Sequence, residues 1–203
     1  MTKLILASGS PRRKELLSKV GYTFEVVPSD APEIVEDTKP SKVVESLSRV
    51  KTLDVYDKEK AKMTNQDTVE DFVVLGADTI VALDDQIMGK PRDKQHAFSM
   101  LKSLQGRSHS VFTGVTLKGF IGGMELEDTF HVQTNVSFFP LSDEEIWEYL
   151  SDQEYADKAG SYAIQGLGTL LVDKIDGDFN NVVGLPIASV HRHLRELLQR
   201  GNK

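Results

Sequence analysis

The segment LILASGSPRR, residues 4–13, restricts the possible folds of this chain more than any other stretch. The apolar run Leu4–Ala7 predicts a β-strand, and the small residues Ser8-Gly9-Ser10 end it. Pro11 suits the first position of a helix and Ser10 is a good N-cap, so a helix is expected from Pro11 to about Gly21. In such a strand–turn–helix unit the N–H groups of the turn and of the helix N-terminus converge, which makes an anion site.

Arg12 and Arg13 stand at the start of this predicted helix. Guanidinium groups can place paired hydrogen bonds on phosphate oxygens, so the unit is suited to phosphate binding. On this segment alone, an ordinary strand–turn–helix with two solvated arginines is the usual alternative. The choice between the two depends on residues farther along the chain.

Predicted strands and helices interleave along the rest of the chain, which indicates an α/β or α+β protein with a mixed sheet. Apolar spacing and capping residues predict helices over 41–62, 93–104, 142–150 and 186–201. Strand-like runs cover 73–75, 79–83, a hairpin over 108–120 and 126–140, and 169–178. The length of 203 residues suits one continuous domain, 1–203, and the polar segment Met63–Phe72 is expected to be a flexible connection.

Composition and charge exclude several classes of function. The net charge of −7 speaks against a nucleic-acid-binding surface, and it makes any local cluster of arginine and lysine more notable. The absence of cysteine excludes disulfides and thiol catalysis. The first residues show no signal-peptide core, and no run approaches the ~20 apolar residues of a membrane span. We therefore expect a cytoplasmic protein with neither a nucleic acid nor a membrane as its partner.

Candidate catalytic residues fall where predicted elements end, and the Walker, GxGxxG, HExxH and GxSxG motifs are absent. Asp78 follows the apolar run 73–77, so its carboxylate is partly desolvated, which favours metal binding or proton transfer; an Asx turn is an equal alternative. Glu33 lies in an acid-rich loop, and Lys51 and Lys90 would each pass for solvated lysines if taken singly. Gln165, between glycines in a predicted loop, could present its amide to a base edge or to a metal-bound water; a hydrogen bond within the loop is the alternative.

Taken together, these side chains suit a small polyanion and a divalent ion. Four cations could neutralise a polyphosphate of roughly four negative charges: Arg12, Arg13, Lys51 and Lys90. Glu33 and Asp78 could hold a divalent cation, because Mg²⁺ prefers a few carboxylates plus phosphate oxygens.

Six segments in one order resemble the Maf family of nucleoside triphosphate pyrophosphatases: LASGSPRR, GADTIV, GKPRD, GRSHSVFTGV, DKAGSYAIQGLG and NNVVGLP. The resemblance spans Leu4 to Pro186. It implies an elongated, two-lobed Maf/ITPase-like α/β fold with a central cleft, often dimeric. It also implies hydrolysis of the α–β phosphoanhydride with a divalent cation (Mg²⁺, Mn²⁺ or Co²⁺), which releases a nucleoside monophosphate and pyrophosphate.

The same resemblance implies roles for individual residues. Asp78 would accept a proton from the attacking water, and Glu33 together with Asp78 would bind the metal. The triphosphate would be bound by Ser8, Arg12, Arg13, Lys51 and Lys90.

The resemblance also implies a substrate subgroup. Relatives that act on dTTP and UTP carry SPRR, ADT and IQG patterns, which Arg12, Thr79 and Gln165 match here, whereas relatives that remove 7-methyl-GTP differ at all three places. Thr52 and Ala163 depart from the usual pattern without altering a charge. Modified pyrimidine nucleotides, as house-cleaning substrates, fit the same signature. A nucleotide-binding regulator of septum formation and cell division, without turnover, is the alternative from another functional class.

Overall fold

The computed structural model describes residues 2–63, 70–152 and 155–202. Its centre is a seven-stranded sheet in the order β2-β1-β3-β5-β6-β7, with β4 paired to β3. The strands are β1 (Lys3–Leu6), β2 (Glu25–Val26), β3 (Phe72–Leu83), β4 (Gln86–Met88), β5 (Ser108–Ile121), β6 (Met124–Phe138) and β7 (Val172–Asp176). The helices are α1 (Pro11–Lys19), α2 (Pro40–Met63), α3 (Lys94–Leu104), α4 (Asp143–Tyr149), α5 (Phe179–Val183) and α6 (Ile187–Gly201), with 3₁₀ turns η2 (Ala159–Ser161) and η3 (Gly166–Leu171).

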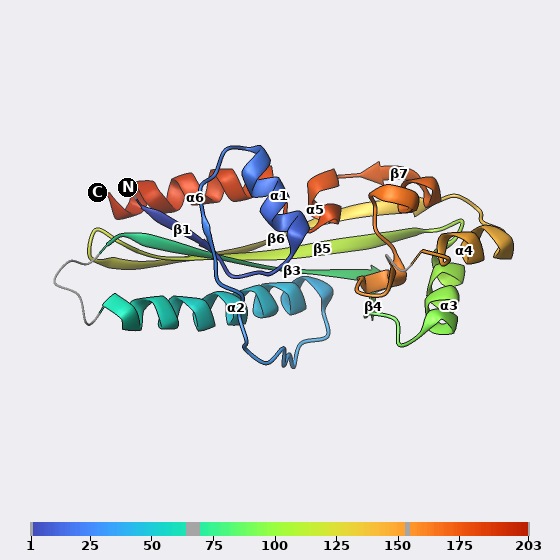
Figure 1. The fold of residues 1–203 in the computed structure, drawn as a ribbon, viewed down its shortest axis with the longest axis horizontal. Helices are drawn as coiled ribbons and strands as arrows, with labels where there is room; N and C mark the ends of the chain where they lie inside the picture. The colour runs from blue at the N-terminus through green and yellow to red at the C-terminus, as the bar shows by residue number, and fades with distance from the viewer. Residues whose placement is uncertain (1, 64–69, 153–154, 203) are drawn as a thin grey trace.

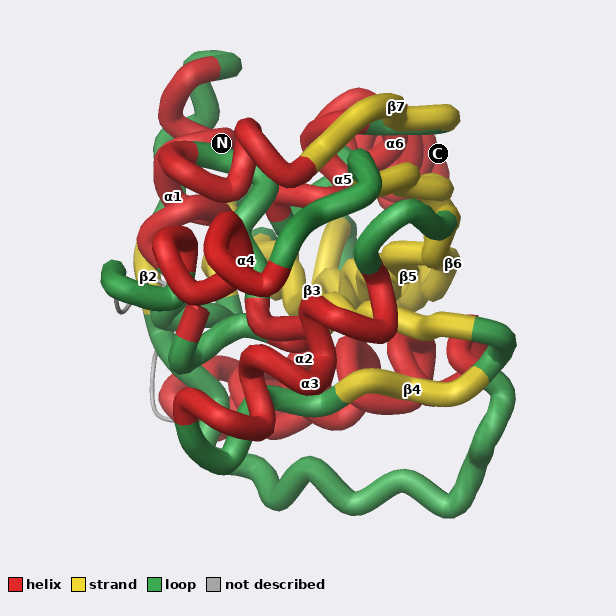
Figure 2. The backbone as a smooth tube through the Cα atoms, turned by 90° about the vertical axis from the view of Figure 1, so that its right-hand side faces the viewer, coloured by secondary structure: helices red, strands yellow, loops and turns green. Residues whose placement is uncertain are grey.

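The molecule is elongated because three long strands, β3, β5 and β6, run side by side along its longest axis (Figure 1). Helix α2 covers one face of the sheet, and α1, α5 and α6 cover the other (Figures 1 and 2). Helices α3 and α4 lie at one end, and both chain termini lie near the opposite end. Strand β1 is parallel to β2 and β3, whereas the other pairs are antiparallel. The predicted mixed sheet and elongated α/β fold are confirmed.

Strand β3 differs from its prediction. The sequence indicated two runs separated by Gly76, with Asp78 just past the first, but one strand continues through both. Gly76 is a site of close packing: a Cβ there would lie 2.2 Å from the Thr52 hydroxyl of α2, and one at Gly114 would lie 2.1 Å from the Val44 carbonyl. Asp78 is therefore a mid-strand residue opposite Gly114 of β5. Pairing with β5 restrains the backbone of Asp78 more than a turn would.

Other boundaries agree in part. Helix α1 begins at Pro11 as predicted, but the Ser10 side chain makes no capping hydrogen bond. The capping box of Ser142 and Glu145 is present at α4. The strand expected from residue 169 begins as the 3₁₀ turn η3, and the short helix α5 was not predicted. Of the expected flexible connection, residues 64–69 lie outside the described residues.

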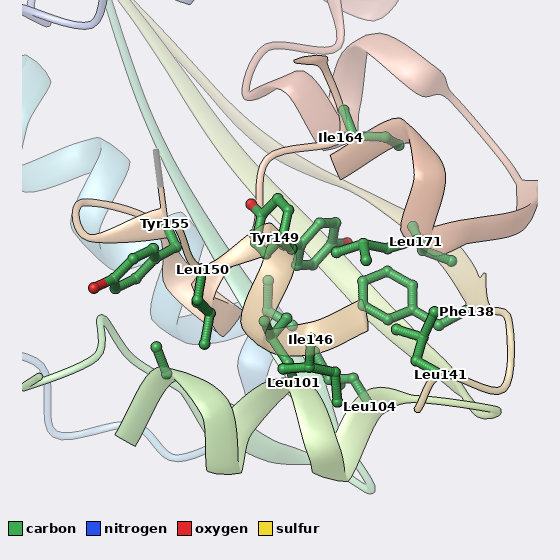
Figure 3. Packing of buried hydrophobic residues seen from close by; sticks show 14 of the residues in the cluster. Leu101, Leu104, Phe138, Leu141, Ile146, Tyr149, Leu150, Tyr155, Ile164 and Leu171 are labelled. Atoms are coloured by element: carbon green, nitrogen blue, oxygen red, sulfur yellow. The ribbon is translucent and has the colours of Figure 1, made fainter. Parts of the chain in front are cut away.

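Two large apolar clusters support the two ends of the sheet. One joins α1, α6 and the strands near the termini, with Leu6, Leu75 and Val190 among its buried members. The other lies between α3, α4, η3 and the far ends of the long strands, as the side chains around Ile146 and Leu101 show (Figure 3). Polar side chains gather between these clusters, along the middle of β3.

Candidate active site

A cavity of about 760 Å³ opens over the middle of β3. Its walls come from the turn before α1, the loop around residue 33, α2, β3 and β4, the segment 157–165, and α5. Eight of the nine residues expected from the sequence line it: Arg12, Arg13, Glu33, Lys51, Asp78, Thr79, Lys90 and Gln165. The ninth, Ser8, is buried beneath and contacts Arg13. Residues far apart in the chain thus share one cavity.

Arg13 is held by three uncharged acceptors. Its Nε donates to the Gly184 carbonyl at 2.8 Å, one terminal nitrogen donates to the Ser8 hydroxyl at 3.0 Å, and the other donates to the Thr79 hydroxyl at 3.2 Å. Burial lowers the pKa of Arg13, the nearby charge of Arg12 acts in the same direction, and the Asp78 carboxylate opposes it. A guanidinium remains charged in proteins. Arg13 therefore presents an oriented positive charge that no carboxylate of the described residues neutralises by direct contact.

Lys51 has the opposite environment, because its ammonium lies between two carboxylates. Lys51 Nζ is 2.7 Å from Glu33 Oε1 and 2.5 Å from Asp78 Oδ1. The side chains of Lys51 and Asp78 are 17% and 13% exposed, whereas that of Glu33 is 60% exposed. The hydrogen bond from Lys51 lowers the pKa of Glu33, and the charges of Lys90 and Arg13 add to this effect. Two acids and one cation leave this part of the cavity with a negative balance.

The remaining expected residues lie around these two centres. Arg12 follows Pro11 on α1, and Lys90 follows β4 as an exposed side chain. Gln165 precedes η3 and lines the same cavity. Apolar side chains also line the cavity, and Val81, Met88 and Ile164 among them belong to one apolar cluster. One part of the cavity is therefore charged, and another suits an uncharged group.

Asp157 and Lys158 also line the cavity, and the sequence reasoning assigned them no role. They form an ion pair with each other. Burial raises the pKa of Asp157, but the ammonium of Lys158 and the charge of Arg12 outweigh it and lower the pKa overall. Both residues stand in the motif DKAGSYAIQGLG, which was the signal available in the sequence.

No histidine of the described residues lines the cavity. His109 is buried in the apolar cluster beyond it, where its Nε2 lies 2.7 Å from the Tyr162 hydroxyl. Burial lowers the pKa of His109 to about 4. His109 therefore has a structural role.

The donor set of Glu33 and Asp78 fits a divalent cation. Both carboxylates already contact one positive group, the Lys51 ammonium. Among the described residues there is no group of three or more histidine, aspartate or glutamate side chains that could hold a metal alone. Mg²⁺ is commonly bound by one or two carboxylates together with substrate phosphates and water, so this pair is sufficient with a phosphate ligand present.

The part of the chain that the structure describes contains no helix long and apolar enough to cross a bilayer.

Comparison with known proteins places the chain in a defined group. A family model described as "Maf-like protein" matches residues 3–197. The chain is 46% identical to the dTTP/UTP pyrophosphatase of Agathobacter rectalis, over 97% of this chain and 98% of the relative. It is 46% identical to that of Carboxydothermus hydrogenoformans, over 96% and 98%, and 47% identical to that of Thermoanaerobacter pseudethanolicus, over 93% of both chains.

Proposed function

The chain belongs to the Maf family, and from this membership we propose that it hydrolyses dTTP and UTP to the nucleoside monophosphate and pyrophosphate. The observation that carries the proposal is the convergence of Arg13, Lys51 and Asp78 on one cavity. The names of the relatives supply the substrates. The enzyme is accordingly a hydrolase of nucleotide metabolism that acts on a phosphoanhydride.

Enzymes catalyse phosphoryl transfer mainly by positioning the reactants and stabilising charge, and less by covalent chemistry of their own. The uncompensated guanidinium of Arg13, with Arg12 beside it, suits the phosphate oxygens of a triphosphate. Lys90 brings a further cation from the β4 side of the cavity. The protein as a whole is acidic, so most of its surface repels anions. A local concentration of cations in the cavity therefore attracts a small polyanion to the cavity.

Asp78 is the residue we assign to proton transfer. Its mid-strand position and low exposure fix the carboxylate, and Lys51 at 2.5 Å orients one of its oxygens. As a general base, Asp78 accepts a proton from the water that attacks the α-phosphorus. The α–β bond then breaks, and pyrophosphate leaves with the bridging oxygen.

We assign the divalent cation to Glu33 and Asp78, with Mg²⁺, Mn²⁺ and Co²⁺ as candidates. When bound, the cation would neutralise phosphate charge and polarise a phosphoryl oxygen. The contact of both carboxylates with the Lys51 ammonium supports this assignment.

Substrate choice is assigned to Arg12, Thr79 and Gln165. Gln165 follows Ile164, which belongs with Val81 and Met88 to the apolar lining of the cavity. An apolar wall separates substrates that differ by one methyl group by only ~1–3 kcal/mol. Modified pyrimidine nucleotides therefore belong among the substrates to be tested.

The deciding experiment measures pyrophosphate release from purified protein with a panel of canonical and 5-substituted nucleoside triphosphates, each with Mg²⁺, Mn²⁺ or Co²⁺. We expect turnover of dTTP and UTP and little of 7-methyl-GTP. Binding of nucleotides without release of pyrophosphate would favour the regulator of cell division instead.

A further inference from the structure

We propose that Thr113 and Asn181, which lie outside the cavity, are positioning residues that orient Arg13 through Thr79. The proposal deepens the proposed function, because it rests on Arg13 as a phosphate-binding residue. It starts from a continuous chain of hydrogen bonds that runs from the cavity through β3 and β5 to α5. None of these bonds is needed to form the sheet itself.

The first arm of this network is direct. Arg13 Nε donates to the carbonyl of Gly184 at 2.8 Å. Gly184 is the C-cap residue of α5 and has a φ of 124°, a value that favours glycine. The position of the acceptor is therefore set by how α5 is held against the sheet.

The second arm runs through two threonines. The Thr113 hydroxyl donates to the Asn181 carbonyl at 2.9 Å, which uses its only hydrogen. In its 2.9 Å contact with Thr79, Thr113 must then be the acceptor and Thr79 the donor. With its own hydrogen committed, the Thr79 oxygen can only accept from Arg13, at 3.2 Å. The chain of bonds has one direction, from the guanidinium to the backbone of α5.

Asn181 also fastens α5 to the sheet. Its Nδ2 donates to the Val111 carbonyl at 3.1 Å and to the Thr134 hydroxyl at 3.0 Å. Thr134 in turn bonds both the carbonyl and the N–H of Asp178, the N-cap residue of α5. Thr113, Thr134 and Asn181 are all 0% exposed, so water does not replace these bonds and their loss is not compensated.

Both of these arms end on α5, whereas the third hydrogen bond of Arg13, to the Ser8 hydroxyl, ends on the turn after β1, and every acceptor is uncharged. The arrangement fixes the direction of the guanidinium without using up its charge. Thr79, one of the residues that match the dTTP/UTP subgroup, has its hydroxyl committed to this network. Its effect on the substrate therefore passes through Arg13.

The central test uses Thr113→Val, which keeps the shape of the side chain and removes its hydroxyl. Without Thr113 as its partner, the Thr79 hydroxyl turns toward the Gly184 carbonyl, 3.5 Å away, and competes with Arg13 Nε. Thr113→Ser restores the hydroxyl. Thr116→Val is the matched control: Thr116 is equally buried on the same strand, but it bonds Ser48 and Thr129 instead.

The first readout is hydrogen exchange of the Arg13 Nε–H group, followed by NMR on the nucleotide-free protein. We expect exchange about tenfold faster in Thr113→Val and unchanged in Thr113→Ser and Thr116→Val. The second readout is kinetic: kcat/KM for dTTP falls about tenfold in Thr113→Val alone, and this loss disappears when Arg13 is also replaced by Met. If Thr113→Val does not fold, Thr79→Val breaks the same chain at a less buried position.

Unchanged Arg13 exchange in folded Thr113→Val, or an equal change in Thr116→Val, overturns the proposal. A wild-type protein that releases no pyrophosphate overturns the proposed function instead, and the exchange measurement still decides whether Thr113 orients Arg13. Loss of stability in Thr113→Val with normal Arg13 exchange and normal kcat/KM would reduce Thr113 to a structural residue.

Discussion

Arg13 and Lys51 are two cations of one cavity, held in opposite ways. Arg13 donates to two hydroxyls and a carbonyl, whereas Lys51 contacts two carboxylates. The charge of Arg13 is therefore available to a ligand, while that of Lys51 is more than balanced by Glu33 and Asp78. We infer an anion-binding part around Arg13 and a cation-binding part around Lys51, Glu33 and Asp78, which together suit a triphosphate with its metal ion.

The difference lies in the elements that supply each centre. Arg13 is anchored by the turn after β1, by β3 within the sheet, and by the end of α5, which is hydrogen-bonded to the sheet. The Lys51 centre joins α2 and β3 to the loop that carries Glu33, whose side chain is mostly exposed. We therefore expect the anion-binding part to be the more rigid of the two and substitutions to affect the two parts differently.

The largest expected effect is on Asp78. Asp78→Asn keeps the shape of the side chain but cannot accept the proton from water, so turnover should fall ~10²- to 10⁴-fold while KM for dTTP changes little. Steady-state kinetics with purified variants checks this. Asp157→Asn, another acid of the cavity wall, is the matched control and should retain most of the activity. Equal losses in both variants would contradict the assignment of Asp78.

The next effect separates the two cations. Arg13→Lys keeps the charge but cannot reach three acceptors at once, and we expect kcat/KM to fall roughly 10- to 100-fold, chiefly through KM. Lys51→Arg still permits ion pairs with Glu33 and Asp78, so its loss should be smaller. Kinetics of both variants, with thermal unfolding to verify folding, would test the comparison. A larger loss in Lys51→Arg would reverse the proposed order of rigidity.

Local patterns were sufficient for much of this fold and site. The strand and helix around Ser8 and Arg13 depend on residues that are adjacent in the sequence, and Pro11 marks the boundary regardless of the rest of the protein. Arg12, Arg13, Asp78 and Lys90 stand in recognisable motifs. Glu33 and Lys51 stand in none and were expected only from their charge and from the family resemblance, and the structure brings all six to one cavity.

What local patterns miss is contact between distant segments. Gly76 suggests a break in a strand, since glycine weakens strands, and only its approach to Thr52 of α2 explains why β3 continues. The bond between Thr113 and Asn181 joins residues 68 positions apart. No periodicity or cap predicts such a pair, and so the network behind Arg13 could not be predicted from the sequence.

A smaller effect concerns the cation-binding part. Lys51→Met removes the ammonium that competes with a metal ion for Glu33 and Asp78. Free Mn²⁺ should then bind about tenfold more tightly, as expected from the loss of a charge repulsion of about 1.4 kcal/mol, near the lower end for two charges at this range. Electron paramagnetic resonance of Mn²⁺ without nucleotide measures this binding. Adding Glu33→Gln to Lys51→Met should reverse the gain. Unchanged or weaker Mn²⁺ binding in Lys51→Met would place the metal elsewhere.

The smallest effect distinguishes the two parts by pH. The pKa of Glu33 lies below its ordinary value of 4.5 because Lys51 donates a hydrogen bond to its carboxylate. The Glu33–Lys51 contact therefore stabilises the folded protein fully above that ordinary value, and its contribution is lost as the pH falls through the lowered pKa. The acceptors of Arg13 are a carbonyl and two hydroxyls, which do not titrate in this pH range. The hydrogen bonds of Arg13 should therefore persist when Glu33 becomes protonated. Following the Glu33 carboxyl and the Arg13 Nε–H by NMR tests both statements on folded protein, with Lys51→Met as the control in which the pKa of Glu33 rises. Because Glu33 is largely exposed, solvent screens the Glu33–Lys51 pair, and the change in overall stability should be slight. An Arg13 resonance that shifts together with that of Glu33 would show that the two parts are not independent.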